Sequence, residues 1–211
     1  MRVLLIGFGP FPGAPFNPSA ALVKALARRR RPAFAEIVCT THVFATTYAA
    51  VDHDLPRLFA LKPDIILMFG LAGRRRQLCI ETRARNAVSV LFPDASGYCP
   101  QRDVIAPGGE AALPAAAPFA GLLGAIRGHR VPARLSRDAG RYLCNYAYWC
   151  ALECARGGRP LVQFVHIPPV SLKPRLRRRN RVRGPSLAAL VGAAEALLIA
   201  LVAASRRQPS A

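Results

Sequence analysis

The chain has 211 residues, of which 52% are hydrophobic, and its formal net charge is +19 at pH 7. Apolar residues spread along the whole length exclude global disorder, and the length predicts one domain, residues 1–211, with a sizeable core. The positive charge predicts attraction to anions such as nucleic acid, acidic lipid or acidic peptides.

The basic residues are nearly all arginines, in separate tracts at 28–31, 74–76, 175–183 and 206–207. A surface that stacks on bases typically has aromatic residues between its basic ones, and these tracts do not have them. The same arginine bias is typical of a GC-rich genome. We therefore expect no specific binding to nucleic acid.

Six cysteines occur, at positions 39, 79, 99, 144, 150 and 154. The apolar run at the start ends in Gly and Pro without a small-residue cleavage site, so no secretion signal is predicted. We expect reduced thiols in a cytoplasmic protein. The chain has no C-x-x-C pair and no complete phosphate-binding fingerprint, so no metal and no cofactor is predicted.

The first elements are typical of an α/β protein. Residues 2–6 form a short apolar run stopped by Gly7, which predicts a buried strand. A loop rich in Gly, Pro and Phe follows, and Asn17 and Pro18 predict the start of a helix over 19–30. Phe8, Phe11 and Phe16 lie on this loop, where α/β proteins bind ligands. They either line a small apolar ligand site or cover the core.

A strand is predicted over 36–44, a helix over 46–61, and a buried strand over 65–69. Glu81 then follows in an apolar context, and a buried carboxylate needs a partner. Arg83 or Arg85 would make a structural ion pair with Glu81. A histidine would make a functional one.

The second half contains fewer patterned segments. Residues 94–118 are rich in Gly and Pro and predict a long surface excursion with little regular structure. A short helix over 118–127, a strand over 131–135 and a buried strand over 161–166, which ends at His166, follow. Residues 171–183 predict a basic, solvated loop. The apolar segment 187–204 contains Glu195 and predicts a packed helix, not a membrane span.

A helix is predicted over 136–156, capped by Asp138 and ended by Gly157 and Gly158. Cys144 lies near its start, where unpaired N–H groups and the helix dipole favour a thiolate. A small core residue is the alternative for Cys144. Cys150 and Cys154 lie deeper in the helix and are expected to pack.

Alternating strands and helices predict an α/β fold with a sheet covered by helices on both faces. Cys144 at a helix start, His166 at the end of a later strand and Glu81 at the end of an earlier one could meet at one edge of that sheet. Together they would supply a nucleophile, a base and a residue that orients the base.

Seven segments resemble one known family in order and spacing: GFGPFPGAPFNPS (7–19), PDIILMFGLAGRR (63–75), IETRARN (80–86), PDASG (93–97), AGRYLCNY (139–146), FVHIP (164–168) and GPSL (184–187). The family is pyroglutamyl peptidase I, or pyrrolidone-carboxylate peptidase, a family of cysteine exopeptidases. The resemblance covers most of the chain. It implies a three-layer α/β/α globule with a mostly parallel, mixed sheet of the phosphorylase/hydrolase-like type, often assembled as a tetramer.

The resemblance also implies a reaction: removal of an N-terminal pyroglutamyl residue from peptides, without metal or cofactor. Cys144 is then the nucleophile, His166 the general acid/base and Glu81 the residue that orients the imidazole. Phe8 and Phe11 match the aromatic residues that hold the lactam ring. Asn17, Leu71 and Asn145 lie in the segments expected to form the substrate site.

The chain departs from the family pattern at three positions. Pro12 replaces a glycine, Leu71 stands where the family usually has Gln, and Leu91 stands where it has an arginine near the substrate carbonyl. Loss of one oxyanion contact typically lowers turnover about 100- to 1,000-fold, and Arg83 or Arg85 is a candidate replacement. These departures keep two alternatives open: a thiol amidohydrolase for another blocked or cyclic acyl group, and a non-catalytic basic binding protein.

Overall fold

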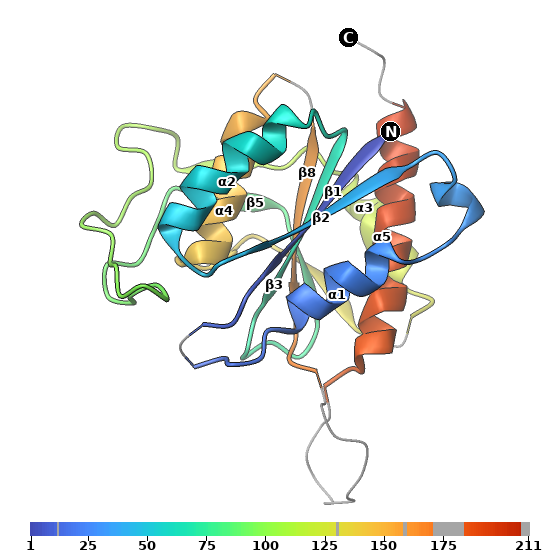
Figure 1. Ribbon diagram of the computed structural model, residues 1–211, viewed down its shortest axis with the longest axis horizontal. Coiled ribbons are helices and arrows are strands. Elements are labelled where there is room, and N and C mark those ends of the chain that lie inside the picture. Colours follow the sequence, from blue (N-terminus) through green and yellow to red (C-terminus); the bar gives the residue numbers. More distant parts are fainter. Residues whose placement is uncertain (12, 130, 158–159, 171–183, 208–211) are drawn as a thin grey trace, which may run out of the picture.

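The computed structural model describes residues 1–11, 13–129, 131–157, 160–170 and 184–207 (Figure 1). In these residues a six-stranded sheet has the order β2-β1-β3-β8-β4-β7. Its neighbours are parallel except β4 and β8, which are antiparallel. The strands are β2 (Val38–Phe44), β1 (Arg2–Phe8), β3 (Ile65–Leu71), β8 (Leu161–Ile167), β4 (Leu78–Glu81) and β7 (Ala133–Ser136).

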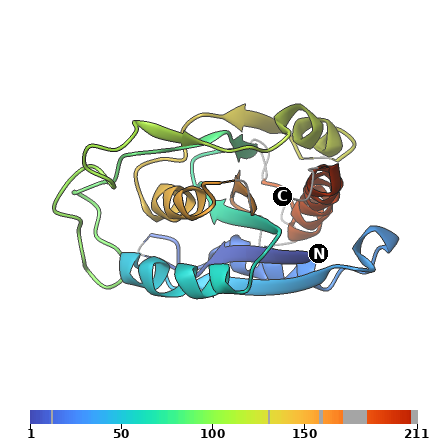
Figure 2. The same cartoon turned by 90° about the horizontal axis from the view of Figure 1, so that it is seen from above.

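Helices cover both faces of this sheet, which confirms the predicted three-layer α/β/α class (Figures 1 and 2). One face packs against α1 (Pro18–Ala27), α3 (Phe119–Ile126) and α5 (Leu187–Arg207), and the other against α2 (Tyr48–Ala60) and α4 (Leu143–Cys154). Alternation along the strands divides the core. In β1, Val3 and Leu5 join the first face, whereas Leu4 and Ile6 join the second.

The central strands are those that the apolar runs predict. Every residue of β8 is buried, as are all but the first residue of β1 and all but the last of β3. Such two-sided burial is typical of parallel strands covered by helices. The strands predicted over 2–6, 65–69 and 161–166 are therefore confirmed.

Asn17 starts α1 as the sequence predicts. Its Oδ1 accepts hydrogen bonds from Ser19 N (3.1 Å) and Ser19 Oγ (2.8 Å), and its Nδ2 donates to Gly9 O (3.0 Å). The helix ends at Ala27, earlier than expected. The strand predicted over 36–44 begins at Val38, after the short 3₁₀ helix η1 (Pro32–Phe34).

By length and composition α5 is apolar enough to cross a membrane, with a mean hydropathy of 2.4 over 18 residues. More than half of that window is buried within the protein, however, against α1, α3 and the sheet. Its buried Glu195 pairs with Arg29 (2.9 Å) and with Arg31. The helix therefore belongs to the core, in agreement with the prediction from sequence.

The excursion over 94–118 is mostly irregular, with one correction. β6 (Ala112–Pro114) pairs antiparallel with β5 (Arg83–Arg85) in a small second sheet. The chain leaves the main sheet at Thr82, whose N–H donates to Ser136 O (2.7 Å) and whose carbonyl accepts from Ala115 N (3.0 Å). Three residues without clear alternation gave no strand signal. The basic loop predicted over 171–183 lies outside the described residues.

Asp94 anchors the excursion to α2. Its Oδ2 accepts from Tyr48 N (3.0 Å) in the first turn of that helix, where a carboxylate also complements the helix dipole. Its Oδ1 accepts from Ser96 N (2.8 Å), Ser96 Oγ (2.6 Å) and Tyr98 N (3.1 Å). Burial raises the pKa of Asp94, but these hydrogen bonds outweigh it and hold the pKa below its ordinary value.

We expect Asp94→Ala to lower the free energy of unfolding by about 2–4 kcal/mol, because it leaves the buried N–H of Tyr48 and the part-buried N–H groups of Ser96 and Tyr98 without an acceptor. Since the folded pKa is lowered, this contribution is present above the ordinary pKa of about 4 and is lost as pH falls below it. Urea denaturation near neutral pH measures the loss. Asp103→Ala is the control, because Asp103 is exposed and contacts Arg141 at 3.5 Å. Equal losses in both variants would contradict the anchoring role.

Candidate active site

Cys144 is the second residue of α4, which begins at Leu143. The helix starts later than predicted because Gly140 has a left-handed backbone, with φ of +87°. Asp138 does not cap it; the Asp138 carboxylate accepts from Gly140 N (3.0 Å) and Arg85 Nη1 (3.2 Å) instead. Within the described residues the N-cap, Tyr142, makes no side-chain cap. The N–H groups of the first turn therefore remain available to an incoming oxyanion.

Helix α4 ends at Cys154, and Gly157, three residues later, has a left-handed backbone with φ of +104°. This agrees with the predicted stop at the glycine pair, of which Gly158 lies outside the described residues. All six cysteines lie in the described chain as free thiols.

The thiol of Cys144 lies over Gly70, near the end of β3. A Cβ atom at Gly70 would lie 2.7 Å from Cys144 Sγ and 2.7 Å from Phe164 Cζ. Across the β3–β8 ladder, Gly70 is the partner of His166. Parallel partners point to the same face and lie about one strand spacing apart, roughly 4.8 Å. The thiol and His166 therefore lie side by side on the face covered by α4.

We expect Gly70→Ala to reduce the kcat/KM of a reaction that uses this thiol by roughly 100-fold, because its methyl group displaces the thiol. The Phe164 ring cannot yield easily, since it is fully buried. Steady-state kinetics measure the effect, and Gly73→Ala is the matched control because a Cβ there meets no atom within 4 Å. Unchanged kinetics in Gly70→Ala would contradict this close approach.

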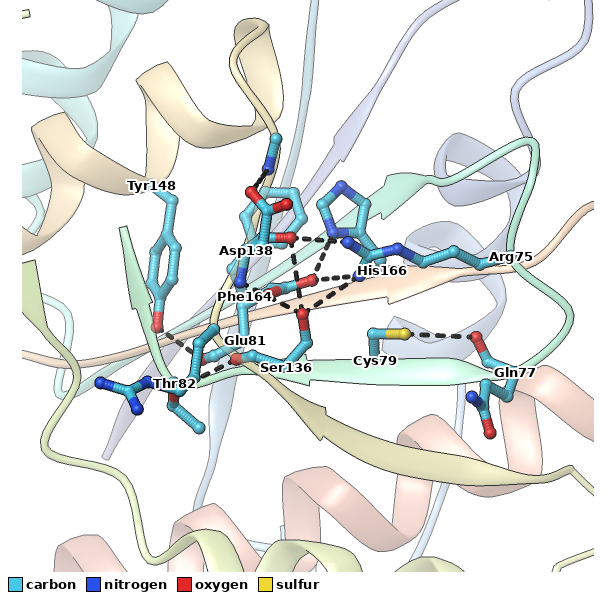
Figure 3. A network of polar contacts seen from close by, with 12 residues as sticks. Arg75, Gln77, Cys79, Glu81, Thr82, Ser136, Asp138, Tyr148, Phe164 and His166 are labelled. Carbon is cyan, nitrogen blue, oxygen red and sulfur yellow. Dashed lines mark hydrogen bonds and ion pairs between the residues drawn. The ribbon is translucent and has the colours of Figure 1, made fainter. Parts of the chain in front are cut away.

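His166 and Glu81 form a buried pair, shown in Figure 3. His166 Nδ1 lies 2.8 Å from Glu81 Oε1. The pair is a diagonal one across antiparallel strands, because Glu81 lies opposite Phe164, two residues before His166. A carboxylate only accepts hydrogen bonds, so Nδ1 carries the hydrogen and Nε2 is the basic nitrogen. The functional alternative for the partner of Glu81, a histidine, is therefore present in the structure.

Glu81 has a second partner that the sequence did not reveal. Arg75 Nη1 donates to the same Oε1 atom at 2.6 Å, and Arg75 Nη2 donates to Asp138 O at 2.6 Å (Figure 3). The predicted structural ion pair of Glu81 with Arg83 or Arg85 is therefore wrong. Arg83 Nε donates to Arg137 O (3.0 Å), and Arg85 pairs with Asp138. Both belong to β5, beyond the point where the chain leaves the main sheet.

The pKa of Cys144 corrects another expectation. Burial, and then the charge of Glu81, raise it to about 12, although Arg75 and the N–H of Cys144 itself lower it. The favourable position at the helix start is thus outweighed by desolvation. The thiol is protonated near neutral pH, so it needs a base that takes its proton during attack.

The two phenylalanines assigned to substrate differ in their surroundings. Phe8 is buried, and its ring centroid lies 5.7 Å from Phe44 and 6.1 Å from Phe164. Phe11 is only half-buried, with its ring 6.4 Å from Tyr142, two residues before the thiol. Sequence reasoning missed Tyr142, whose position just before Cys144 was the available signal. Phe11 and Tyr142 form an aromatic wall beside the start of α4.

Asn145 is fully buried, and its side chain binds backbone. Its Oδ1 accepts from Arg85 N (2.9 Å), and its Nδ2 donates to Arg85 O (2.8 Å) and Ala87 O (2.8 Å). Both amide hydrogens are therefore used, which leaves none for a substrate. Asn17 is also occupied, by Gly9 and Ser19. Both side chains therefore hold backbone: Asn17 binds the loop at Gly9, and Asn145 binds the segment 85–87.

The side chain of Leu71 points away from the thiol. Leu71 pairs with Ile167, which belongs to the opposite core face from His166, so strand alternation directs its side chain away from Cys144. Leu91 is 79% exposed in the segment that precedes the excursion. Tyr142 Oη donates to Pro93 O (2.9 Å), which ties this segment to the start of α4. Pro12 lies outside the described residues. In the described part of the chain, no three His, Cys, Asp or Glu side chains form a group suited to a metal.

A thiol in the first turn of a helix, beside a histidine bonded to a buried carboxylate, is the arrangement of an α/β cysteine peptidase. The comparisons give the particular family. A family model described as pyroglutamyl peptidase matches residues 1–207, and the chain belongs to that family. The resemblance found in the sequence is therefore confirmed.

Individual relatives agree. The chain is 34% identical over 171 residues to a pyrrolidone-carboxylate peptidase of Thermococcus onnurineus, covering 80% of this chain and 84% of the relative. It is 30% identical over 198 residues to that of Vibrio vulnificus, covering 94% and 91%. Among solved structures, pyroglutamyl peptidase I of Bacillus amyloliquefaciens has a TM-score of 0.81 at 28% identity, covering 96% and 97%. The Thermococcus litoralis pyrrolidone carboxyl peptidase has a TM-score of 0.85 at 26% identity, covering 100% and 97%.

Proposed function

We propose that this chain hydrolyses the amide bond after an N-terminal pyroglutamyl residue of peptides, with Cys144, His166 and Glu81 as its catalytic residues. The observation that carries the proposal is the buried His166–Glu81 hydrogen bond beside a thiol held over Gly70. Membership of the pyroglutamyl peptidase family indicates which acyl group the substrate carries.

The first half of the reaction forms a thioester. Cys144 Sγ attacks the carbonyl carbon of the pyroglutamyl residue while His166 Nε2 takes the thiol proton. The resulting oxyanion accepts hydrogen bonds from the N–H groups at the start of α4. The C–N bond then breaks, and the proton passes from Nε2 to the departing amine. Glu81 stabilises the imidazolium through Nδ1–H during these steps.

The second half hydrolyses the thioester. A water molecule gives its proton to His166 Nε2 as its oxygen attacks the acyl carbon. Collapse of this second tetrahedral intermediate breaks the C–S bond and releases pyroglutamate. The proton on Nε2 returns to Cys144, which restores the neutral thiol favoured by its raised pKa.

The acyl group is held by aromatic and backbone contacts in this proposal. Phe11 and Tyr142 provide a wall for the flat lactam ring. Phe8 contributes indirectly, because its ring packs against that of Phe164. Leu71 contributes through its backbone, because its side chain points to the other face. Asn17 and Asn145 act indirectly. Asn17 fixes the loop that carries Phe11, and Asn145 fixes the segment 85–87.

The test is release of a fluorophore from pyroglutamyl, alanyl and acetyl amides under the same conditions. We expect turnover of the pyroglutamyl compound alone. Turnover of another acyl amide alone would favour the second candidate, a related thiol amidohydrolase, which the exposed, uncharged Leu91 motivates. No turnover of any amide, with no alkylation of Cys144 by iodoacetamide, would contradict both and favour a non-catalytic basic binding protein.

Three further expectations accompany the proposal. The free thiols support a cytoplasmic location. Assembly as a tetramer and the lack of specific nucleic-acid binding stay predictions. Light scattering of the purified chain tests the tetramer. Retention on a polyanion, compared with that of a protein of equal charge, tests nucleic-acid binding.

A further inference from the structure

Arg75 lies in the site without a part in the reaction described above. Its guanidinium donates to Glu81 Oε1 (2.6 Å), to Ser136 Oγ (3.3 Å) and to Asp138 O (2.6 Å), as Figure 3 shows. Glu81 is 0% exposed, and its Oε2 has no hydrogen-bond partner in the described residues. One buried carboxylate oxygen thus receives both the imidazole and a guanidinium.

We propose that Arg75 is a positioning residue of this reaction, which balances the buried charge of Glu81 and fixes the Glu81–His166 pair relative to the helix of Cys144. The inference rests on the proposed function. Arg75 does not touch the reacting atoms; it acts through Glu81 and through the backbone that leads to α4.

The first part of this role concerns charge. A buried negative charge is costly unless a positive charge lies beside it, and the negative charge of Glu81 is what stabilises an imidazolium at His166. With Arg75 the site carries one positive and one negative charge and is neutral. It stays neutral when the proton moves from Cys144 to His166. Without Arg75, both states would bury one net negative charge.

The other groups that face Glu81 do not supply this cation. They are His166 on β8, Cys144 and Tyr148 on α4, and Cys79 on β4 itself. Burial raises the pKa values of Cys144 and Tyr148, so both are neutral near neutral pH. Burial lowers the pKa of Arg75, but Cys79 and Glu81 more than reverse this and raise it above its ordinary value. Among the described residues around Glu81, Arg75 is therefore the permanent cation.

The second part concerns geometry. Arg75 joins the end of β4 at Glu81, the end of β7 at Ser136, and the loop at Asp138 that leads into α4. The planar guanidinium makes these bonds at once, since its N–H groups are fixed in a fork. A lysine would keep the charge but lose the fork. The two parts of the role can therefore be separated by substitution.

The experiment compares Arg75→Met, Arg75→Lys and Arg75→Gln with the wild type. Arg74→Met is the matched control, because Arg74 is the exposed neighbour with the same charge. The readouts are kcat and KM for a pyroglutamyl amide from about pH 5 to pH 10, and the pH dependence of Cys144 alkylation by iodoacetamide. Near-ultraviolet circular dichroism and Tm check that each variant is folded.

For Arg75→Met we expect kcat to fall about 100-fold with KM within about threefold, because the loss arises in the chemical steps. The acid limb should move upward by at least about one pH unit, since removal of a cation favours the more protonated state of the buried site that it faces. Arg75→Lys should keep the acid limb within about half a unit and lower kcat only about tenfold. Arg74→Met should match the wild type.

An unshifted acid limb in Arg75→Met, or equal losses in Arg75→Met and Arg75→Lys with one shared pH profile, would overturn the proposal. If Arg75→Met does not fold, Arg75→Gln decides, because it lacks the charge but retains N–H donors, and its acid limb must rise. Absence of turnover in the wild type would contradict the proposed function instead. The alkylation profile, whose acid limb should shift in the same way, still tests Arg75 in that case.

Discussion

Cys144→Ala is expected to lower kcat on a pyroglutamyl amide by at least about 10⁵-fold, because removal of the nucleophile ends the thioester route. Its Sγ lies over Gly70 beside His166, and in the described part of the chain no other cysteine lies at the start of a helix on this face. Alanine fills less space and leaves the first turn intact. Tm should therefore change little, which separates loss of chemistry from loss of fold.

Cys150→Ala is the matched control, since Cys150 lies six residues further along the same helix. Burial raises its pKa to about 12 as well, so an acidic thiol cannot distinguish the two residues. Activity that survives in Cys144→Ala, or is lost equally in Cys150→Ala, would contradict the assignment of the nucleophile.

Glu81→Gln is expected to lower kcat by about 10⁴-fold, the loss typical when a triad carboxylate becomes an amide. In Glu81 one carboxylate oxygen, Oε1, accepts from both His166 Nδ1–H and Arg75 Nη1. In glutamine one of the two carboxylate oxygen positions is taken by an NH₂ group. The side-chain NH₂ group must then meet one of these donors or the fully buried position of Oε2. Loss of the negative charge also leaves an imidazolium without its counter-charge.

The same variant should lower the free energy of unfolding by about 2–4 kcal/mol, because a buried pair loses one partner. The side chain of Arg75 is 23% exposed and can recover some hydration, which places the loss below the largest known cases. Urea denaturation and steady-state kinetics measure the two effects. Glu153→Gln is the control, as Glu153 forms an exposed pair with Arg156 at 2.9 Å and should cost less than about 1 kcal/mol.

Much of the fold was predictable from the sequence, because the buried strands are continuous apolar runs. β1, β3 and β8 are such runs, and Asn17 marks the start of α1 by its own hydrogen bonds. The start of α4 was not predictable in the same way. Asp138 and Gly140 suggested a cap and an entry, but the backbone of Gly140 is left-handed, and the helix begins only after it. A glycine permits either outcome, so composition alone does not decide.

The members of the site came from motif spacing, whereas their electrostatic surroundings did not. Three consecutive arginines precede Glu81, and nothing in the sequence says that Arg75 turns inward while its two neighbours stay exposed. Likewise, the helix start suggested an acidic thiol at Cys144, but desolvation depends on side chains brought together by the fold. Such contacts join residues far apart in sequence, and local patterns do not encode them.

The most direct test of the central claim is mass spectrometry of the intact protein, quenched in acid during turnover of a pyroglutamyl amide. We predict a mass increase of one pyroglutamyl acyl group, located by peptide mapping on Cys144 and absent from Cys144→Ala. Turnover with the acyl group on another residue, or turnover that persists in Cys144→Ala without any acyl adduct, would contradict the account.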